Sequence, residues 1–402
     1  MAATLQRKGM FAGLTRNTFL LALASFFSDI STEMLYPVLP VFLTGTLKAD
    51  GAVVGLIEGV AGATQNIVPG FAGPLSDRLK RRKGIALVGF ALSAVSKPLI
   101  GLSTAWTGVL GARFLDRFGA GTRGAPRDAL VAASAAPEHR GKAFGLEGFG
   151  DNAGAFVGPL IAVALLAAWR VNLRWIFYAA IIPGFLAFLM VLLVGERKSE
   201  PSDKANFASA LRRFPRRYRG YLIATAIFGL GNSSNAFLIL DLKGLGVSLT
   251  ETILVYAAFN LVAALVSYPA GALSDRLGRR AIIFMAFAVF FVAYAGFAVT
   301  RSAVVAASLF VLYGLFQGPY RMAGKAFAAD LSPEDQRASG VGWFGASAGV
   351  SGLVASGVAG LLWDHAGHPA VFYFGAALAI AGVLAMAWLT PERTANAAVS
   401  PD

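Results

Sequence analysis

The chain has 402 residues, of which 56% are hydrophobic and only 14% are charged, a composition too apolar for an ordinary water-soluble globular protein. The apolar residues come in runs of about twenty, the length that a helix needs to cross a bilayer, so we predict a polytopic membrane protein. The net charge of +13 falls mainly in the short links between these runs, which argues against a nucleic-acid partner. The absence of cysteine excludes disulfides and thiolate-bound metals.

Cutting the chain at its charged or Gly/Pro-rich links predicts an all-α protein with twelve membrane-spanning helices. The first six are expected at 17–44, 51–72, 84–104, 106–128, 141–168 and 174–195. The second six are expected at 219–243, 249–271, 280–300, 303–329, 338–363 and 369–390.

A polar, Arg-rich segment separates the two sets of helices and indicates two domains. We predict an N-terminal bundle at 1–195, a cytoplasmic linker at 196–218, a C-terminal bundle at 219–390 and a cytoplasmic tail at 391–402. Lys and Arg concentrate in one set of alternate links, which places both termini in the cytoplasm. The expected location is the cell membrane, with a bacterial inner membrane favoured.

One stretch of sequence occurs twice, as GPLSDRLKRRK at 73–83 and as GALSDRLGRR at 271–280. The offset of 271 − 73 = 198 residues is close to half of the chain, so the repeat indicates a duplication at the scale of a domain. Two similar bundles place the natural substrate site at the seam between them, near the middle of the membrane.

The repeated stretch resembles the signature motif of the major facilitator superfamily, glycine-x-leucine-x-aspartate-arginine-x-glycine-arginine-arginine, with Lys80 in place of a glycine in the first copy. The resemblance covers essentially the whole chain. It implies two pseudo-symmetric six-helix bundles that give access to a central site from alternate sides of the membrane.

The aspartates of the motif are expected at cytoplasmic helix ends, where each can pair with an arginine of another helix. Basic pairs at i, i+4 spacing, on one helix face, recur at the 198-residue offset in the fourth and tenth helices. We therefore predict a gate whose ion pairs help to set the balance between two conformations, the alternative being that the basic residues only determine topology. The predicted gate residues are Asp77, Arg78, Arg123, Arg127, Asp275, Arg276, Arg321 and Lys325.

Ionisable residues inside the membrane are functional candidates, because a charge at that depth is costly unless it is paired or hydrated. Asp29 and Glu33 lie one turn apart on the first helix, and two adjacent carboxylates do not both ionise cheaply in a low dielectric. One of them should therefore hold a proton, as a proton-coupling site requires. Fixed basic partners that neutralise both carboxylates are the alternative.

The fourth helix supplies the expected partners, because Arg113, Asp116 and Arg117 share one face at i, i+3, i+4 spacing. The second half has Val311, Gly314 and Leu315 at the equivalent positions. The stretch resembles the helix 4 motif of proton-coupled members of the superfamily, with Asp116 at the position of a glutamine. We predict that Asp29, Glu33, Arg113 and Asp116 couple protons, and that Arg117 joins their ion-pair network.

Two further charges, Glu58 in the second helix and Lys97 in the third, are expected to pair with each other. The seventh helix carries an uncharged polar patch that suits hydrogen bonding to a solute. Pro37 and Pro40 are expected to kink the first helix. The predicted substrate-binding residues are Tyr36, Lys97, Arg117, Asn232, Asn235 and Gln317.

Glycines four residues apart in the fifth helix, Gly150, Gly154 and Gly158, permit close contact with another helix. They resemble the core of the motif associated with antiporters of the superfamily, with Ala162 and Val163 in place of its last two glycines. The resemblance favours export over import.

The sequence thus predicts a proton-coupled secondary transporter that exports a small amphiphilic or anionic organic solute. The alternatives are a proton symporter that imports a small anion or metabolite, and a lipid transporter or flippase on the same fold. No phosphate-binding loop, Ser/His/Asp arrangement or metalloprotease helix is present, so we expect no enzymatic activity, cofactor or metal, with the proton gradient as driving force. The expected partners are the solute and the bilayer, and the expected state is a monomer.

Overall fold

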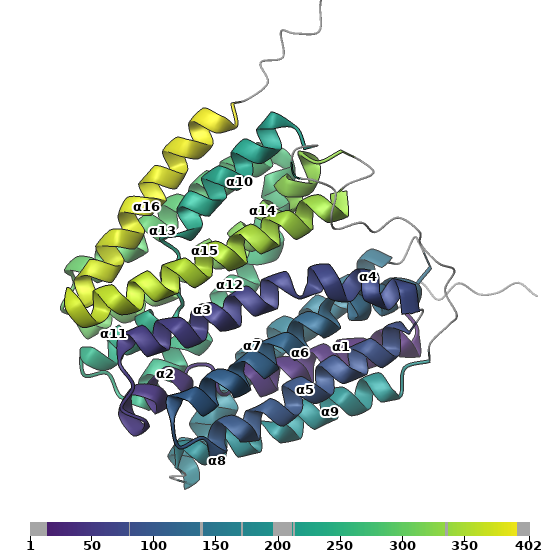
Figure 1. The fold of residues 1–402 in the computed structure, drawn as a ribbon, viewed down its shortest axis with the longest axis horizontal. Helices are drawn as coiled ribbons and strands as arrows, with labels where there is room; N and C mark the ends of the chain where they lie inside the picture. The colour runs from purple at the N-terminus through teal and green to yellow at the C-terminus, as the bar shows by residue number, and fades with distance from the viewer. Residues whose placement is uncertain are drawn as a thin grey trace, which may run out of the picture.

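The computed structural model describes residues 14–79, 81–136, 140–169, 172–195, 211, 214–333 and 337–391, and their regular structure is helical (Figure 1). The first half comprises α1 (Arg16–Glu33), α2 (Leu39–Val41), the π-helix η1 (Phe42–Thr46), α3 (Gly51–Ile67), α4 (Pro69–Leu79), α5 (Arg82–Leu102), α6 (Trp106–Ala133), α7 (Arg140–Trp169), α8 (Leu173–Ala179) and α9 (Ile181–Leu192). The second half comprises α10 (Arg216–Gly229), α11 (Ala236–Gly244), α12 (Leu249–Leu277), α13 (Arg279–Val299), α14 (Ala303–Asp330), α15 (Arg337–His365) and α16 (His368–Leu389).

These helices form the twelve predicted spans, because four spans consist of consecutive helices. The interrupted spans are α1 with α2 and η1, α3 with α4, α8 with α9, and α10 with α11. Within the described residues, nine helical stretches are long and apolar enough to cross a membrane. The chain is therefore an all-α membrane protein of two six-helix bundles. The predicted linker lies outside the described residues except for 211 and 214–218, as does the tail after 391, so the domain boundaries stay predictions.

The repeated motif lies on helix ends rather than in loops, because α4 continues to Leu79 and α12 to Leu277. The first span is interrupted next to Pro37 and Pro40, where a kink is expected, because α1 ends at Glu33 and regular helix resumes with α2 and η1. A second interruption, at 230–235 between α10 and α11, contains no proline.

The two halves lie side by side, with most of α1 to α9 toward the lower right of Figure 1 and most of α10 to α16 toward the upper left. Helices α3 and α15 pack against each other along the boundary, and α7 packs against α12. We call the end of the bundle that carries the links at 47–50, 245–248 and 366–367 the distal face, and the opposite end the terminal face. The two groups of helices diverge toward the terminal face in Figure 1.

Close packing of α1 against α7 depends on the glycines predicted to allow it. A Cβ atom added to Gly150 would lie 2.4 Å from the Ala22 carbonyl oxygen, and one added to Gly154 would lie 2.4 Å from that of Phe26. Both obstacles are backbone atoms, which cannot rotate away. The glycines therefore hold α1, with its carboxylates, directly against α7.

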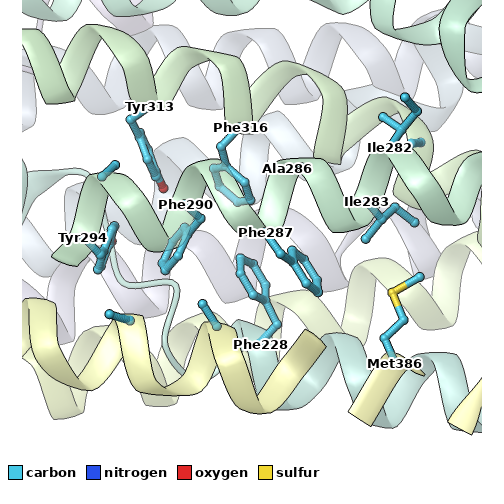
Figure 2. Close-up of a cluster of buried hydrophobic side chains, with 14 of the residues drawn as sticks. Phe228, Ile282, Ile283, Ala286, Phe287, Phe290, Tyr294, Tyr313, Phe316 and Met386 are labelled. Carbon is cyan, nitrogen blue, oxygen red and sulfur yellow. The ribbon is translucent and has the colours of Figure 1, made fainter. Parts of the chain in front are cut away.

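The cores of the two halves differ in composition. The second half is filled by aromatic rings, several of which Figure 2 shows packed between α10, α13 and α14. The rings of Phe228 and Phe287 are stacked with centroids 3.8 Å apart, and those of Phe290 and Tyr294 with centroids 4.0 Å apart. The first half instead encloses charged side chains, which form the candidate site.

Candidate functional site

Asp116, on α6, is the centre of a buried charged cluster. Its Oδ1 accepts hydrogen bonds from Lys97 Nζ at 2.8 Å and from Ser93 Oγ at 2.6 Å. Its Oδ2 lies 3.1 Å from Arg113 Nη1 and 3.4 Å from Arg117 Nε. Lys97, Arg113 and Asp116 are each only 1% exposed, so solvent does not screen these ion pairs.

Glu58, on α3, completes the cluster from the side of the second half. Its Oε1 lies 3.1 Å from both Nε and Nη2 of Arg113. The expected pairing of Glu58 with Lys97 is therefore wrong, because Arg113 takes Glu58 and Asp116 takes Lys97. The central cluster, defined as Glu58, Lys97, Arg113, Asp116 and Arg117, contains three basic and two acidic side chains.

Arg117 lies at the edge of this cluster. Its Nη1 donates a hydrogen bond of 2.8 Å to Gln65 Oε1, and its side chain remains 10% exposed. Lys97, by contrast, also donates to the carbonyl oxygen of Ser93 at 3.0 Å and is enclosed within its own half. The substrate-binding roles of both residues stay predictions, and Arg117 is the less buried of the two.

The two carboxylates of α1 stand outside the central cluster, contrary to the expected ion-pair network. Within the described part of the chain, neither Asp29 nor Glu33 forms an ion pair with a nitrogen within 4.0 Å, and Asp29 has no hydrogen-bond partner. Both side chains are partly exposed. Glu33 Oε2 accepts a hydrogen bond of 2.7 Å from the hydroxyl of Tyr256, on α12 of the other half.

The non-helical stretch at 230–235 brings the polar patch of the seventh span to the seam between the halves. The Ser234 hydroxyl lies 3.2 Å from the Tyr36 hydroxyl and 3.4 Å from Glu58 Oε2. The ring of Tyr36 stacks on that of Tyr256 at 5.4 Å between centroids, and the Arg113 guanidinium lies over Tyr36 at 5.5 Å. Tyr36 therefore connects the central cluster with the other half.

The remaining polar candidates lie next to this stretch in the second half. Asn232 Oδ1 accepts a hydrogen bond of 3.1 Å from the Tyr313 hydroxyl, and Asn235 Nδ2 donates one of 3.3 Å to Gln317 Oε1. Asn232, Asn235 and Gln317 are all partly buried. Their role in binding a solute stays a prediction.

The basic residues of the predicted gate are held in different ways. Arg127 is paired within its own half, with Nη1 at 3.0 Å from Glu147 Oε1 and 3.5 Å from Asp151 Oδ1. Arg123 is 8% exposed and lies over the ring of Phe90.

In the second half, Arg321 and Lys325 are exposed and form no ion pair with another described residue, and Arg276 is also exposed. The side chains of Asp77, Arg78 and Asp275 lie outside what the structure describes. The gate therefore stays a prediction. No group of three His, Asp or Glu side chains among the described residues could hold a metal ion.

The charged face of α6 and the intramembrane charge of Glu58 could be recognised in the sequence, because Glu58 is the only charged residue in the predicted span at 51–72. The partner of Glu58 could not be predicted. Gln65, which binds Arg117, was missed, since polar residues in membrane helices are often packing contacts and an isolated glutamine carries no signal of its own.

Comparison with known proteins agrees with this architecture. A family model described as Major Facilitator Superfamily matches residues 21–220 and 221–402. An uncharacterised MFS-type transporter of Methanocaldococcus jannaschii is 32% identical over 91% of this chain and 93% of its own length. A multi-drug resistance efflux pump PmrA homolog of Lactococcus lactis is 26% identical over 80% of this chain and 81% of its own length. The crystal structure of a POT family transporter in complex with 5-aminolevulinic acid superposes with a TM-score of 0.80, at 16% identity, over 96% of this chain and 98% of that one.

Proposed function

The chain belongs to the major facilitator superfamily of secondary transporters, and from this premise we propose that it exports a small amphiphilic or anionic organic solute in exchange for protons. Membership makes it a transporter rather than an enzyme, and a multi-pass membrane protein. The proton coupling, the direction and the class of solute are the proposal. We place the terminal face in the cytoplasm, because Lys and Arg concentrate in its links.

The observation that carries the proposal is the hydrogen bond between Glu33 and Tyr256, which joins the two halves through a titratable group. An ionised carboxylate accepts a hydrogen bond about twice as strong as a neutral one does. Protonation of Glu33 therefore weakens a contact that links the halves, and ionisation strengthens it. A proton at this position changes the relative energies of two arrangements of the halves, as coupled transport requires.

The fixed ion pairs beside Glu33 explain why the proton would bind there. Lys97 and Arg113 are held by Asp116 and Glu58, so their charges are already compensated within the central cluster. Glu33 and Asp29 have no such partner among the described residues, and both are partly exposed. These two carboxylates are therefore the groups in the middle of the first half that can gain or lose a proton without breaking a buried ion pair.

The class of solute follows from the groups that face the seam. The stacked rings of Tyr36 and Tyr256 offer an apolar surface with hydroxyl groups at its edge. Arg117 adds a positive charge, because the central cluster contains one more basic than acidic side chain. Amide groups of Asn232, Asn235 and Gln317 supply hydrogen bonds from the opposite half. This combination suits an organic solute with an aromatic or apolar part and an anionic or polar group.

Export rather than import is supported by two similarities. One is the likeness to the efflux pump homolog of Lactococcus lactis over most of both chains. The other is the series of glycines in α7, which holds α1 against α7 and resembles the core of the antiporter motif. Import by proton symport remains the alternative, and the direction of the imposed gradient that drives solute movement distinguishes the two.

We expect Glu33→Gln to separate solute movement from the proton gradient. In proteoliposomes, a gradient of one pH unit can drive an accumulation of up to about tenfold per coupled proton, because one pH unit corresponds to about 1.4 kcal/mol. Counterflow of a transported solute should persist in the variant, because Gln keeps the shape of Glu. Accumulation driven by the pH gradient, and the accompanying proton flux seen with a pH-sensitive dye, should be lost.

The matched control is Asp330→Asn, which removes a carboxylate that is 56% exposed and pairs with Arg279 at the end of α14. This variant should keep both counterflow and gradient-driven accumulation. Asp29→Asn tests the second carboxylate in the same assay. If Glu33→Gln and Asp29→Asn both retain gradient-driven accumulation, the carboxylates of α1 do not couple protons and the proposal is wrong.

A further inference from the structure

A carboxylate of the second half caps a helix of the first half at the distal face. Asp364, near the end of α15, accepts hydrogen bonds from the backbone N–H groups of Gly51 at 2.8 Å and Ala52 at 2.7 Å. These are the first two residues of α3, whose N–H groups have no partner within the helix. A negative charge at this position also interacts favourably with the positive end of the helix dipole.

The same helix end has a second cap, which comes from its own half. The side chain of Asp50, at the N-cap position of α3, accepts a hydrogen bond of 2.9 Å from the Val53 N–H. Helix α3 is thus capped locally by Asp50 whatever the second half does. Asp364 is therefore not needed to begin the helix, and its contacts serve to join the halves.

The surroundings of Asp364 fix its position. The ring of the preceding residue, Trp363, lies against the start of α3, since a Cβ atom added to Gly51 would be 2.7 Å from Trp363 Cδ1. The Trp363 ring also stacks on the ring of His368, with centroids 3.8 Å apart and an interplanar angle of 13°. His368 Nδ1 lies 3.6 Å from Asp241 Oδ1, on α11. Asp364 is therefore presented to α3 by a group of side chains that belongs to the second half.

We propose that Asp364 is a reversible lock on the distal face, holding the start of α3 while that face is closed and releasing it when the halves separate there. Both hydrogen bonds cross the boundary between the halves, so a separation of a few ångströms breaks them together. Asp364 is exposed, and water can solvate its carboxylate and the freed N–H groups. The contact therefore has the moderate strength of a hydrogen bond that exchanges with water, unlike the buried ion pairs of the central cluster.

The lock is tested by measuring the width of the distal face directly. The chain has no cysteine, so spin labels can be attached to Thr46→Cys and Ser302→Cys, which replace exposed residues of the first and second half on this face. The distribution of distances between the labels reports how much of the protein is open there. We expect Asp364→Ala to raise the ratio of distal-open to distal-closed protein about tenfold, equivalent to about 1.4 kcal/mol. Asp364→Asn, which keeps one acceptor oxygen but loses the charge, should give a smaller shift in the same direction.

The matched control is Asp50→Ala, which removes a carboxylate from the same helix end without removing a contact between the halves. It should leave the distance distribution unchanged. An unchanged distribution in Asp364→Ala, or an equal shift in Asp50→Ala, would overturn the lock. The inference rests on the alternating access of the proposed function, but the distance measurement needs neither solute nor proton gradient. A shift in Asp364→Ala together with unchanged coupling in Glu33→Gln would therefore reject the proton proposal and retain the lock.

Discussion

Asp116→Asn should destabilise the folded protein by about 3–5 kcal/mol, the cost of removing one partner from a buried ion pair. The carboxylate of Asp116 is the common partner of Lys97, Arg113 and Arg117. Its neutralisation leaves three basic groups with Glu58 as the only acidic member of the central cluster. The loss should appear in detergent as a marked fall in the temperature at which half of the protein remains folded and monodisperse.

A second carboxylate on the same helix supplies the control for this prediction. Asp128 is 52% exposed and pairs with Arg127, so Asp128→Asn should cost no more than about 1 kcal/mol, as for a surface ion pair. Lys97→Met in the Asp116→Asn background removes a buried charge that has lost its partner and should recover part of the stability. Equal stabilities for Asp116→Asn and Asp128→Asn would show that the central cluster does not support the fold.

Gly55→Ala should strongly disfavour closure of the distal face. A Cβ atom at Gly55 would lie 2.0 Å from the Ser356 carbonyl oxygen on α15, and a backbone atom cannot move aside without moving its helix. Overpacking of this kind costs about 1–3 kcal/mol, which corresponds to about 5–150-fold in a conformational equilibrium. Solute counterflow should slow accordingly, because each cycle requires α3 and α15 to meet.

Gly62, further along α3, is the matched control, because an added Cβ atom there would meet nothing within 4 Å. Gly62→Ala should transport like the parent, and the distance between labels at positions 46 and 302 should lengthen only in Gly55→Ala. If both variants transport at the rate of the parent, tight contact between α3 and α15 is not part of the cycle.

The membrane spans could be predicted from the sequence because their length is set by the thickness of the bilayer. The third span, expected at 84–104, is α5 at Arg82–Leu102. The bilayer thickness does not determine where a helix ends once it has left the hydrocarbon. For this reason the expected end of the fourth span, at 128, was too early, and α6 extends to Ala133. The break at 230–235 was also missed, because it has no proline. Its backbone groups are bound by serine hydroxyls instead, since Ala236 N–H donates to Ser234 Oγ and Ser234 N–H donates to Ser356 Oγ on α15.

Within the candidate site, the sequence predicted which charged residues share a face of one helix, but it did not predict which residues pair between helices. The i, i+3, i+4 pattern correctly placed Arg113, Asp116 and Arg117 on one face, since helical geometry fixes those neighbours. The choice of Glu58 for Arg113 and of Lys97 for Asp116 depends on how α3, α5 and α6 pack. Sequence separation carries no information about such contacts between helices, and the expected pairing of Glu58 with Lys97 failed for that reason.

The hydrogen bond between Tyr36 and Ser234 has a geometric meaning that follows from the duplication. The two residues are 198 positions apart, the same offset that relates the two copies of the repeated motif. They are thus equivalent positions of the two halves, and equivalent positions can touch only beside the pseudo-twofold axis. When two halves tilt in opposite senses about the centre of the molecule, displacement grows with distance from that centre. Under the proposed alternating access, Tyr36 and Ser234 therefore lie at the centre of the tilt, where contact can persist while the distal and terminal faces open in turn.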